Sequence, residues 1–241
     1  MDADQLIGAG MMGPLMGGYK RASFDAANYA MTVDGNSISD AAVSDLIAQL
    51  QAIPPISGKF TVTNKAINGQ NTQQMIANAS DVDSSYVNGK RNILFVWELT
   101  NNIHNIGRTG PQTIQDTIDY IVARQAYVAA NRPGQKPWIV VLATGTPRGD
   151  FLGAYFTAAQ GEIEMQYCNA YIRANYRAMG AKAYVEMRRP GGPWDFTDVN
   201  NAANFPATYW RDKTHPKNGA GGGTPILAGY IADVLKRLPD R

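Results

Sequence analysis

The stretch Ile93-Leu94-Phe95-Val96-Trp97 decides the fold class, because all five consecutive residues are apolar. A second run of the same kind, Trp138-Ile139-Val140-Val141-Leu142, follows further along the chain. A strand that is apolar on both faces needs a covering layer on each side, which is typical of a parallel sheet enclosed by helices. The two runs therefore predict an α/β protein.

Weaker strand patterns and helical patterns surround these two runs. Strand patterns occupy residues 30–34, 59–64 and 183–187. Apolar residues recur at helical spacing in residues 40–53, 72–78, 114–129, 161–179 and 224–238. We expect Gly180 to cap the fourth of these helices and Thr224, followed by Pro225, to cap the start of the last. The alternation predicts an open, doubly wound parallel sheet of about five strands.

One domain is expected to hold this sheet. Residues 29–241 are assigned to the domain, because a chain of this length can bury a real core. Residues 1–28 are expected to be an irregular lead-in, since they contain five glycines, one proline and little periodicity. Neither a signal peptide nor a membrane span is visible, so a soluble protein is expected. The compartment and the oligomeric state stay open.

The composition argues against several classes of partner and cofactor. Lys and Arg number 22 and Asp and Glu number 20, a net charge of +2, so nucleic acid is not expected as a partner. The one cysteine, Cys168, cannot form an internal disulfide and is expected to be a small core residue. Residues 8–13 (GAGMMG) have a dinucleotide-binding spacing but follow no strand. We expect no metal and no cofactor.

Polar segments follow the predicted strands. In sheets of this kind, ligands bind beyond the carboxyl ends of the strands. A further polar segment, DKTHP, precedes the last helix. We expect these segments to meet at one edge of the sheet: GNSIS at 35–39, AINGQ at 66–70, ELTNN at 98–102, ATGTPR at 143–148 and DKTHP at 212–216.

A serine, a histidine and an aspartate are available in these segments. A serine hydroxyl is a poor nucleophile until an adjacent base takes its proton. Of the two histidines, only His215 has a nearby acid, Asp212, that could orient its ring. Ser37 is the candidate nucleophile. From spacing alone His215 could equally be a surface loop residue, whereas His104 is expected to line or flank the cleft.

Acyl transfer also needs hydrogen-bond donors for an oxyanion. Gly69 can offer its backbone N–H, Asn101 its side-chain amide and Ser37 its own backbone N–H. The loss of one such donor typically lowers the rate about 10²–10³-fold. Taken singly, Gly69 could be only a turn residue and Asn101 only a helix cap.

These segments together resemble the four sequence blocks of the SGNH hydrolases, also called the GDSL esterase/lipase family. The blocks correspond to GNS at 35–37, NG at 68–69, LTNN at 99–102 and DKTHP at 212–216. The resemblance covers about residues 29–238 and implies a three-layer α/β/α, flavodoxin-like fold. It also implies that Ser37, His215 and Asp212 form a catalytic triad, that Ser37, Gly69 and Asn101 bind the oxyanion, and that no cofactor takes part.

The chain departs from the family pattern at three positions. Asn36 and Asn102 stand where the blocks carry Asp, and Leu99 stands where they carry Gly. None of these changes removes a group that performs the chemistry. Ser39 occupies the last place of a Gly-x-Ser-x-Gly pattern, which argues against the nucleophile elbow of the α/β-hydrolases.

The substrate is less defined by the sequence. No pattern for a long acyl tunnel or a lid is visible, which favours a short acyl group such as acetyl on a carbohydrate, so the expected partner is a small-molecule or glycan ester. Asn36, Trp194 and Trp210 are candidate substrate contacts, although the aromatic rings could instead cover the core. Arg148, Arg188 and Arg189 could meet an anionic group or be solvated. The alternative is a non-catalytic carbohydrate-binding or structural module that retains the SGNH fold.

Overall fold

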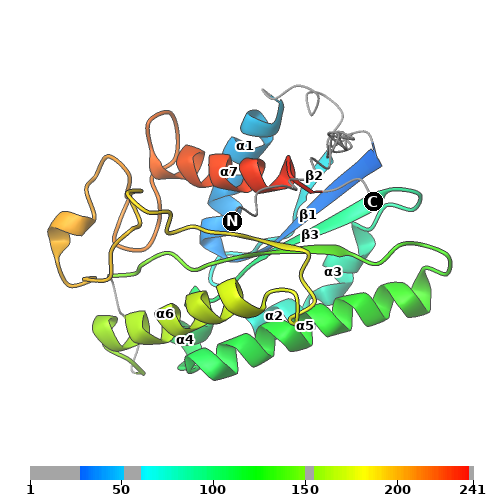
Figure 1. Cartoon of the computed structure of the whole chain (residues 1–241), viewed down its shortest axis with the longest axis horizontal. Helices are drawn as coiled ribbons and strands as arrows, with labels where there is room; N and C mark the ends of the chain where they lie inside the picture. The colour runs from blue at the N-terminus through cyan, green and yellow to red at the C-terminus, as the bar shows by residue number, and fades with distance from the viewer. Residues whose placement is uncertain (1–27, 52–60, 150–154, 239–241) are drawn as a thin grey trace, which may run out of the picture.

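A computed structural model describes residues 28–51, 61–149 and 155–238 (Figure 1). Residues 1–27, which include nearly all of the expected lead-in and the glycine pattern at 8–13, lie outside this range. The described residues contain one five-stranded parallel sheet in the order β2-β1-β3-β4-β5, which confirms the expected α/β class. The strands are β1 (Tyr29–Gly35), β2 (Thr61–Asn64), β3 (Arg91–Trp97), β4 (Ile139–Ala143) and β5 (Ala183–Val185).

The strand order creates a switch point between β1 and β3. The chain passes from β1 to β2 on one side and then returns to place β3 on the other side of β1. Gly35 at the carboxyl end of β1 pairs in register with Trp97 at the carboxyl end of β3. A crevice at such a point is the usual ligand site of this architecture.

Helices cover both faces of the sheet (Figure 1). On one face lie α1 (Ser37–Gln51) and α7 (Gly223–Leu235), which contact each other. The other face carries α2 (Thr72–Ala77), α3 (Ala79–Ser84), α4 (Thr100–Ile106), α5 (Gly110–Asn131) and α6 (Ala158–Asn175).

The core consists of two layers, because alternate residues of each strand point to opposite faces. Phe95 packs in the cluster under α1 and α7, whereas its neighbours Leu94 and Val96 pack in the cluster under α5 and α6. All three side chains are buried. The two covering layers thus explain why the run at 93–97 is apolar throughout. Cys168 is buried in the second cluster, as expected, and burial raises the pKa of its thiol.

Several helix boundaries differ from the prediction. The helices α3 and α4 were not predicted, because each is too short to show a clear apolar period. Gly180 does not cap α6, which already ends at Asn175. The expectation that Thr224 caps α7 is also wrong: the helix begins at Gly223, with Gly222 in the capping position. The Thr224 hydroxyl instead donates to the carboxylate of Asp45 on α1.

Two features that the described residues lack bear on function. No helix in this part of the chain is long and apolar enough to cross a membrane. Within the same ranges, no group of three or more His, Cys, Asp or Glu side chains is placed to hold a metal ion.

Candidate active site

Ser37 is presented by a tight turn between β1 and α1. Gly35 has φ +155°, and a Cβ atom there would lie 2.3 Å from the carbonyl oxygen of Trp97, so only glycine fits. The side-chain oxygen of Asn36 accepts the backbone N–H of Ile38 at 2.9 Å, which caps the first turn of α1. The turn therefore places Ser37 as the first residue of α1, at the carboxyl edge of the sheet.

Asp212 and His215 lie in a short hairpin that precedes α7. The N–H of Arg211 donates to the carbonyl oxygen of His215 at 2.9 Å, which joins the two arms of the hairpin. The N–H of Gly149 donates to the carbonyl oxygen of Lys213 at 2.9 Å. This second bond ties the tip of the hairpin to the segment that follows β4, so the position of the imidazole is held from two sides.

The structure brings the three residues of the predicted triad into one hydrogen-bonded line. Ser37 Oγ lies 2.9 Å from His215 Nε2, and His215 Nδ1 lies 3.0 Å from each carboxylate oxygen of Asp212. Burial alone would raise the pKa of Asp212, but hydrogen bonds from His215 and Thr214 outweigh it and lower that pKa to about 2. The ionised carboxylate favours a proton on Nδ1, which leaves Nε2 as an acceptor towards Ser37.

Gly69 and Asn101 face the same region from two other segments. Gly69 has φ +77° in the turn after β2, a conformation that favours glycine. Asn101 lies in the first turn of α4, and its Nδ2 donates to the carbonyl oxygen of Gln70 at 2.9 Å. An amide nitrogen carries two hydrogens, so the second can serve an oxyanion.

A cavity of about 490 Å³ is lined by Ser37, Gly69, Asn101 and His215. Its other described lining residues are mostly polar, and Ile38 and Ala41 are the apolar ones among them. The polar ones are Asn36, Asp40, Asn68, Thr100, Asn105, Arg148, Arg211, Thr214 and Asn218. Such a lining suits a hydroxyl-rich ligand better than a long apolar chain.

Trp194 and Trp210 do not line this cavity, so the expectation that they contact a substrate is wrong. Their exposed fractions are 0% and 2%, and their ring centroids lie 6.1 Å apart. Phe196 and Phe205 pack edge-on against the Trp210 ring and complete an aromatic cluster. The aromatic residues of this segment therefore pack in the core, which is the alternative that the sequence analysis left open for them.

Asn36 and His104 also have defined places. Asn36 lines the cavity but is only 2% exposed, and both polar ends of its side chain bond within the protein. His104 is buried on α4, where burial and then the positive charge of Arg148 lower its pKa to about 2. His104 is therefore neutral at ordinary pH. It is not among the residues that line the cavity.

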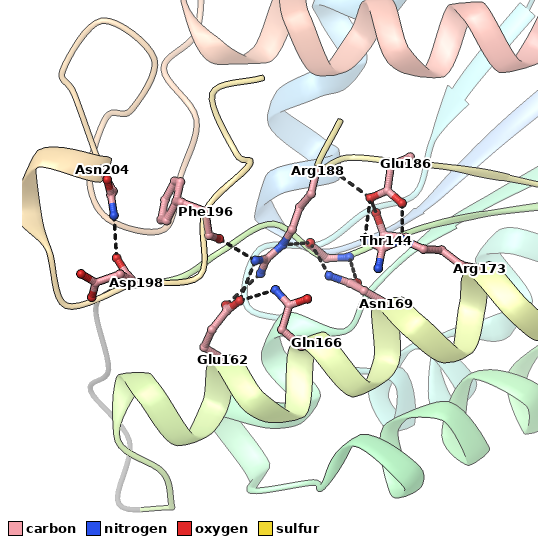
Figure 2. A network of polar contacts seen from close by, with 11 residues as sticks. Thr144, Glu162, Gln166, Asn169, Arg173, Glu186, Arg188, Phe196, Asp198 and Asn204 are labelled. Carbon is pink, nitrogen blue, oxygen red and sulfur yellow. Dashed lines mark hydrogen bonds and ion pairs between the residues drawn. The ribbon is translucent and has the colours of Figure 1, made fainter. Parts of the chain in front are cut away.

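Arg188 is neither solvated nor available to an anionic ligand. Its guanidinium forms a two-pronged ion pair with Glu162 on α6, at 2.6 Å and 2.8 Å (Figure 2). It also donates to the carbonyl oxygens of Gly145 at 3.0 Å and Phe196 at 2.8 Å. This buried group joins the segments after β4 and β5 to α6, which the local sequence pattern did not indicate.

Comparison with known proteins supports the fold. No protein-family model and no curated protein sequence matches the chain. A G-D-S-L family lipolytic protein from Veillonella parvula has a TM-score of 0.59 and 18% identity over 87% of this chain and 100% of its own. The aryl esterase of M. smegmatis has a TM-score of 0.61 and 11% identity over 87% of this chain and 99% of its own.

A third solved structure with this fold is named an acetylxylan esterase. An acetylxylan esterase from Geobacillus stearothermophilus has a TM-score of 0.53 and 18% identity over 88% of this chain and 97% of its own. The described residues thus form an α/β fold with a five-stranded parallel sheet and a strand-end cavity. This fold is the SGNH hydrolase fold, which the chain shares with these three solved structures, one of them a G-D-S-L family protein.

Proposed function

We propose that the chain is a serine esterase that hydrolyses carboxylic esters through an acyl-enzyme. The observation that carries this proposal is the line of contacts from Ser37 Oγ through the two ring nitrogens of His215 to Asp212. A serine hydroxyl hydrogen-bonded to an imidazole, which a carboxylate orients in turn, is the arrangement that activates a nucleophile for acyl transfer.

The reaction follows from this geometry. Ser37 Oγ attacks the ester carbonyl carbon while His215 Nε2 takes the hydroxyl proton. The tetrahedral intermediate collapses when the same nitrogen gives that proton to the leaving alcohol. Water then attacks the acyl-enzyme while His215 Nε2 takes its proton. The acid is released when the same nitrogen returns that proton to Ser37 Oγ and the bond between Oγ and the acyl carbon breaks.

Three donors are proposed to receive the negative charge of the tetrahedral intermediate. They are the backbone N–H groups of Ser37 and Gly69 and the side-chain amide of Asn101. All three residues line the same cavity. Because one amide hydrogen of Asn101 is held by the carbonyl oxygen of Gln70, the direction of the other is fixed before substrate binds.

The substrate is proposed to carry a short acyl group, such as acetyl, on a carbohydrate. The polar lining of the cavity supports a hydroxyl-rich alcohol part. Two of the structures with this fold are named acetyl xylan esterases. Their identity to this chain is 15% and 18%, so the substrate needs a direct test.

Hydrolysis of p-nitrophenyl acetate and covalent labelling by a fluorophosphonate probe test the reaction. Ser37→Ala should abolish labelling and most turnover. Ser44→Ala changes an exposed serine of the same helix and should leave both unchanged. An active Ser37→Ala variant would refute the assignment. A folded wild-type protein with neither activity would favour a non-catalytic module.

A panel of p-nitrophenyl esters of increasing acyl length, followed by acetylated xylan, tests the substrate. The expected result is the highest kcat/KM for acetyl and release of acetate from the glycan. A preference for long acyl chains would contradict the substrate proposal and leave the esterase proposal intact.

A further inference from the structure

Glu98 is a buried carboxyl group directly beneath the proposed site. It follows the last residue of β3, is 2% exposed and is not among the residues that line the cavity. Its Oε1 accepts the backbone N–H of Asn102 on α4 at 2.9 Å. Its Oε2 accepts the side-chain amide of Asn36, the residue before Ser37. One carboxyl group therefore joins the nucleophile turn to the helix that carries Asn101.

The orientation of the Asn36 amide is determined by its other contact. Its oxygen accepts the backbone N–H of Ile38 at 2.9 Å, so its nitrogen must face Glu98. An aspartate at position 36 could still accept from Ile38, but it would place a second carboxyl group against Glu98 in a buried site. Asn36 stands where the family blocks carry Asp, and its amide supplies a hydrogen-bond donor that the Glu98 carboxyl group can accept.

The same connection extends to the segment after Gly69. The side-chain oxygen of Asn102 accepts the backbone N–H of Thr72, the first residue of α2, at 2.8 Å. Gly69 lies just before this helix, and Asn102 is held by Glu98. The three segments that supply the proposed oxyanion donors are therefore linked through Glu98.

We propose that Glu98 is a positioning residue that holds Ser37 and Asn101 at a fixed separation, with Asn36 as its matched amide partner. This inference rests on the proposed esterase function. Burial raises the pKa of Glu98 to about 8, in spite of its bonds to Asn36 and to the backbone N–H groups of Asn102 and Asn101. A protonated carboxyl keeps acceptor capacity, so the pairing does not depend on its charge.

An exchange of donor and acceptor tests the pairing. Above pH 8, where Glu98 is ionised, Asn36→Asp sets two carboxylates against each other, and Glu98→Gln presents amide hydrogens to groups that are themselves donors, so the assay is run there. Each single variant should lower kcat for p-nitrophenyl acetate about 10²-fold, with KM within about threefold, because misplaced groups chiefly lose rate. In the double variant, the Gln amide can donate to the Asp carboxylate and its oxygen can accept from Asn102. The double variant should therefore recover kcat to within about tenfold of wild type.

The readouts separate positioning from general stability. kcat is calculated per active site, counted by fluorophosphonate labelling, and folding is followed by circular dichroism. Full kcat in either single variant, or a double variant that is unfolded or no better than the singles, would overturn the pairing. Single variants that fail to fold, together with a folded and active double variant, would support it. A wild-type protein without turnover or labelling would overturn the esterase proposal, and the positioning role with it.

Discussion

Replacement of Glu162 by Gln is expected to be strongly destabilising, because it strands the charge of Arg188 inside the protein. The side chains of Arg188 and Glu162 are 4% and 5% exposed. Among the described residues, the other acceptors of the guanidinium are the neutral carbonyl oxygens of Gly145 and of Phe196, the second of which is drawn in Figure 2. After the substitution, these hydrogen bonds remain, but among the described residues no other carboxylate forms an ion pair with Arg188.

The magnitude follows from this burial. Removal of one partner of a buried ion pair typically costs about 3–5 kcal/mol. Gln keeps one side-chain oxygen that can accept from Arg188, so we expect the lower end, about 3 kcal/mol. A domain of this length has a free energy of unfolding of about 5–15 kcal/mol, so the loss is a large fraction of the total. The corresponding fall in Tm is roughly 6–12 °C.

Urea unfolding at neutral pH, followed by circular dichroism, measures the loss. Asp233→Asn is the matched control, because it makes the same chemical change in a surface pair. Asp233 lies 3.0 Å from Arg189, and the two side chains are 40% and 30% exposed. The control should cost about 0–1 kcal/mol. Equal losses in the two variants would refute the argument, since they would mean that burial does not raise the cost of losing the anion.

Three further predictions concern the site and its surroundings. Asp212→Asn should lower kcat for p-nitrophenyl acetate about 10³–10⁴-fold with little change in Tm, because Nδ1 loses the anion that favours its proton; a tenfold loss or less would contradict the role of Asp212. Gly35→Ala should lower the free energy of unfolding by about 1–3 kcal/mol in urea titrations, because the new Cβ would meet the Trp97 carbonyl oxygen at 2.3 Å. The control is Gly229→Ala on α7, where a Cβ meets nothing within 4 Å, and it should be neutral or stabilising. The free energy of unfolding should fall as pH rises from about 6 to about 8, because burial raises the pKa of Glu98 from 4.5 to about 8 and the folded state then binds more protons than the unfolded state. The raised pKa of Asp34, about 6, lies at the lower end of this pH range, so Glu98 should dominate the change of unfolding free energy with pH there. Glu98→Gln should therefore reduce that pH dependence, and an unchanged pH dependence would contradict the attribution to Glu98.

The fold class could be predicted from the sequence because it depends on local patterns. The runs at 93–97 and 138–142 are apolar on both faces, and only a sheet covered on both sides buries such strands completely. Asp212 and His215 could be paired for a similar reason: they are three residues apart, so one short hairpin brings the carboxylate to the ring. Cys168 was placed in the core by its helical spacing.

Other features were decided only by tertiary structure. Ser37 and His215 are 178 positions apart, and no local pattern brings them to 2.9 Å. The sequence resemblance suggested their meeting, but the switch point between β1 and β3 and the hairpin before α7 produce it. The sequence allowed Trp194 and Trp210 to face either the cleft or the core. Their packing against each other, and that of Trp210 against the ring of Phe205, places them in the core.

The burial of Glu98 and of Arg188 likewise could not be predicted from the sequence. Nothing in their sequence neighbourhoods distinguishes a buried carboxylate or guanidinium from a solvated one. Each is buried because distant segments supply its partners: Asn36 for Glu98, and Glu162 with the carbonyl oxygen of Gly145 for Arg188. The sequence by itself determined the strands, the longer helices and the chemical groups of this protein, since these depend on near neighbours along the chain. Tertiary structure alone decided which charges lie inside, because burying a charge is tolerable only where distant segments satisfy it.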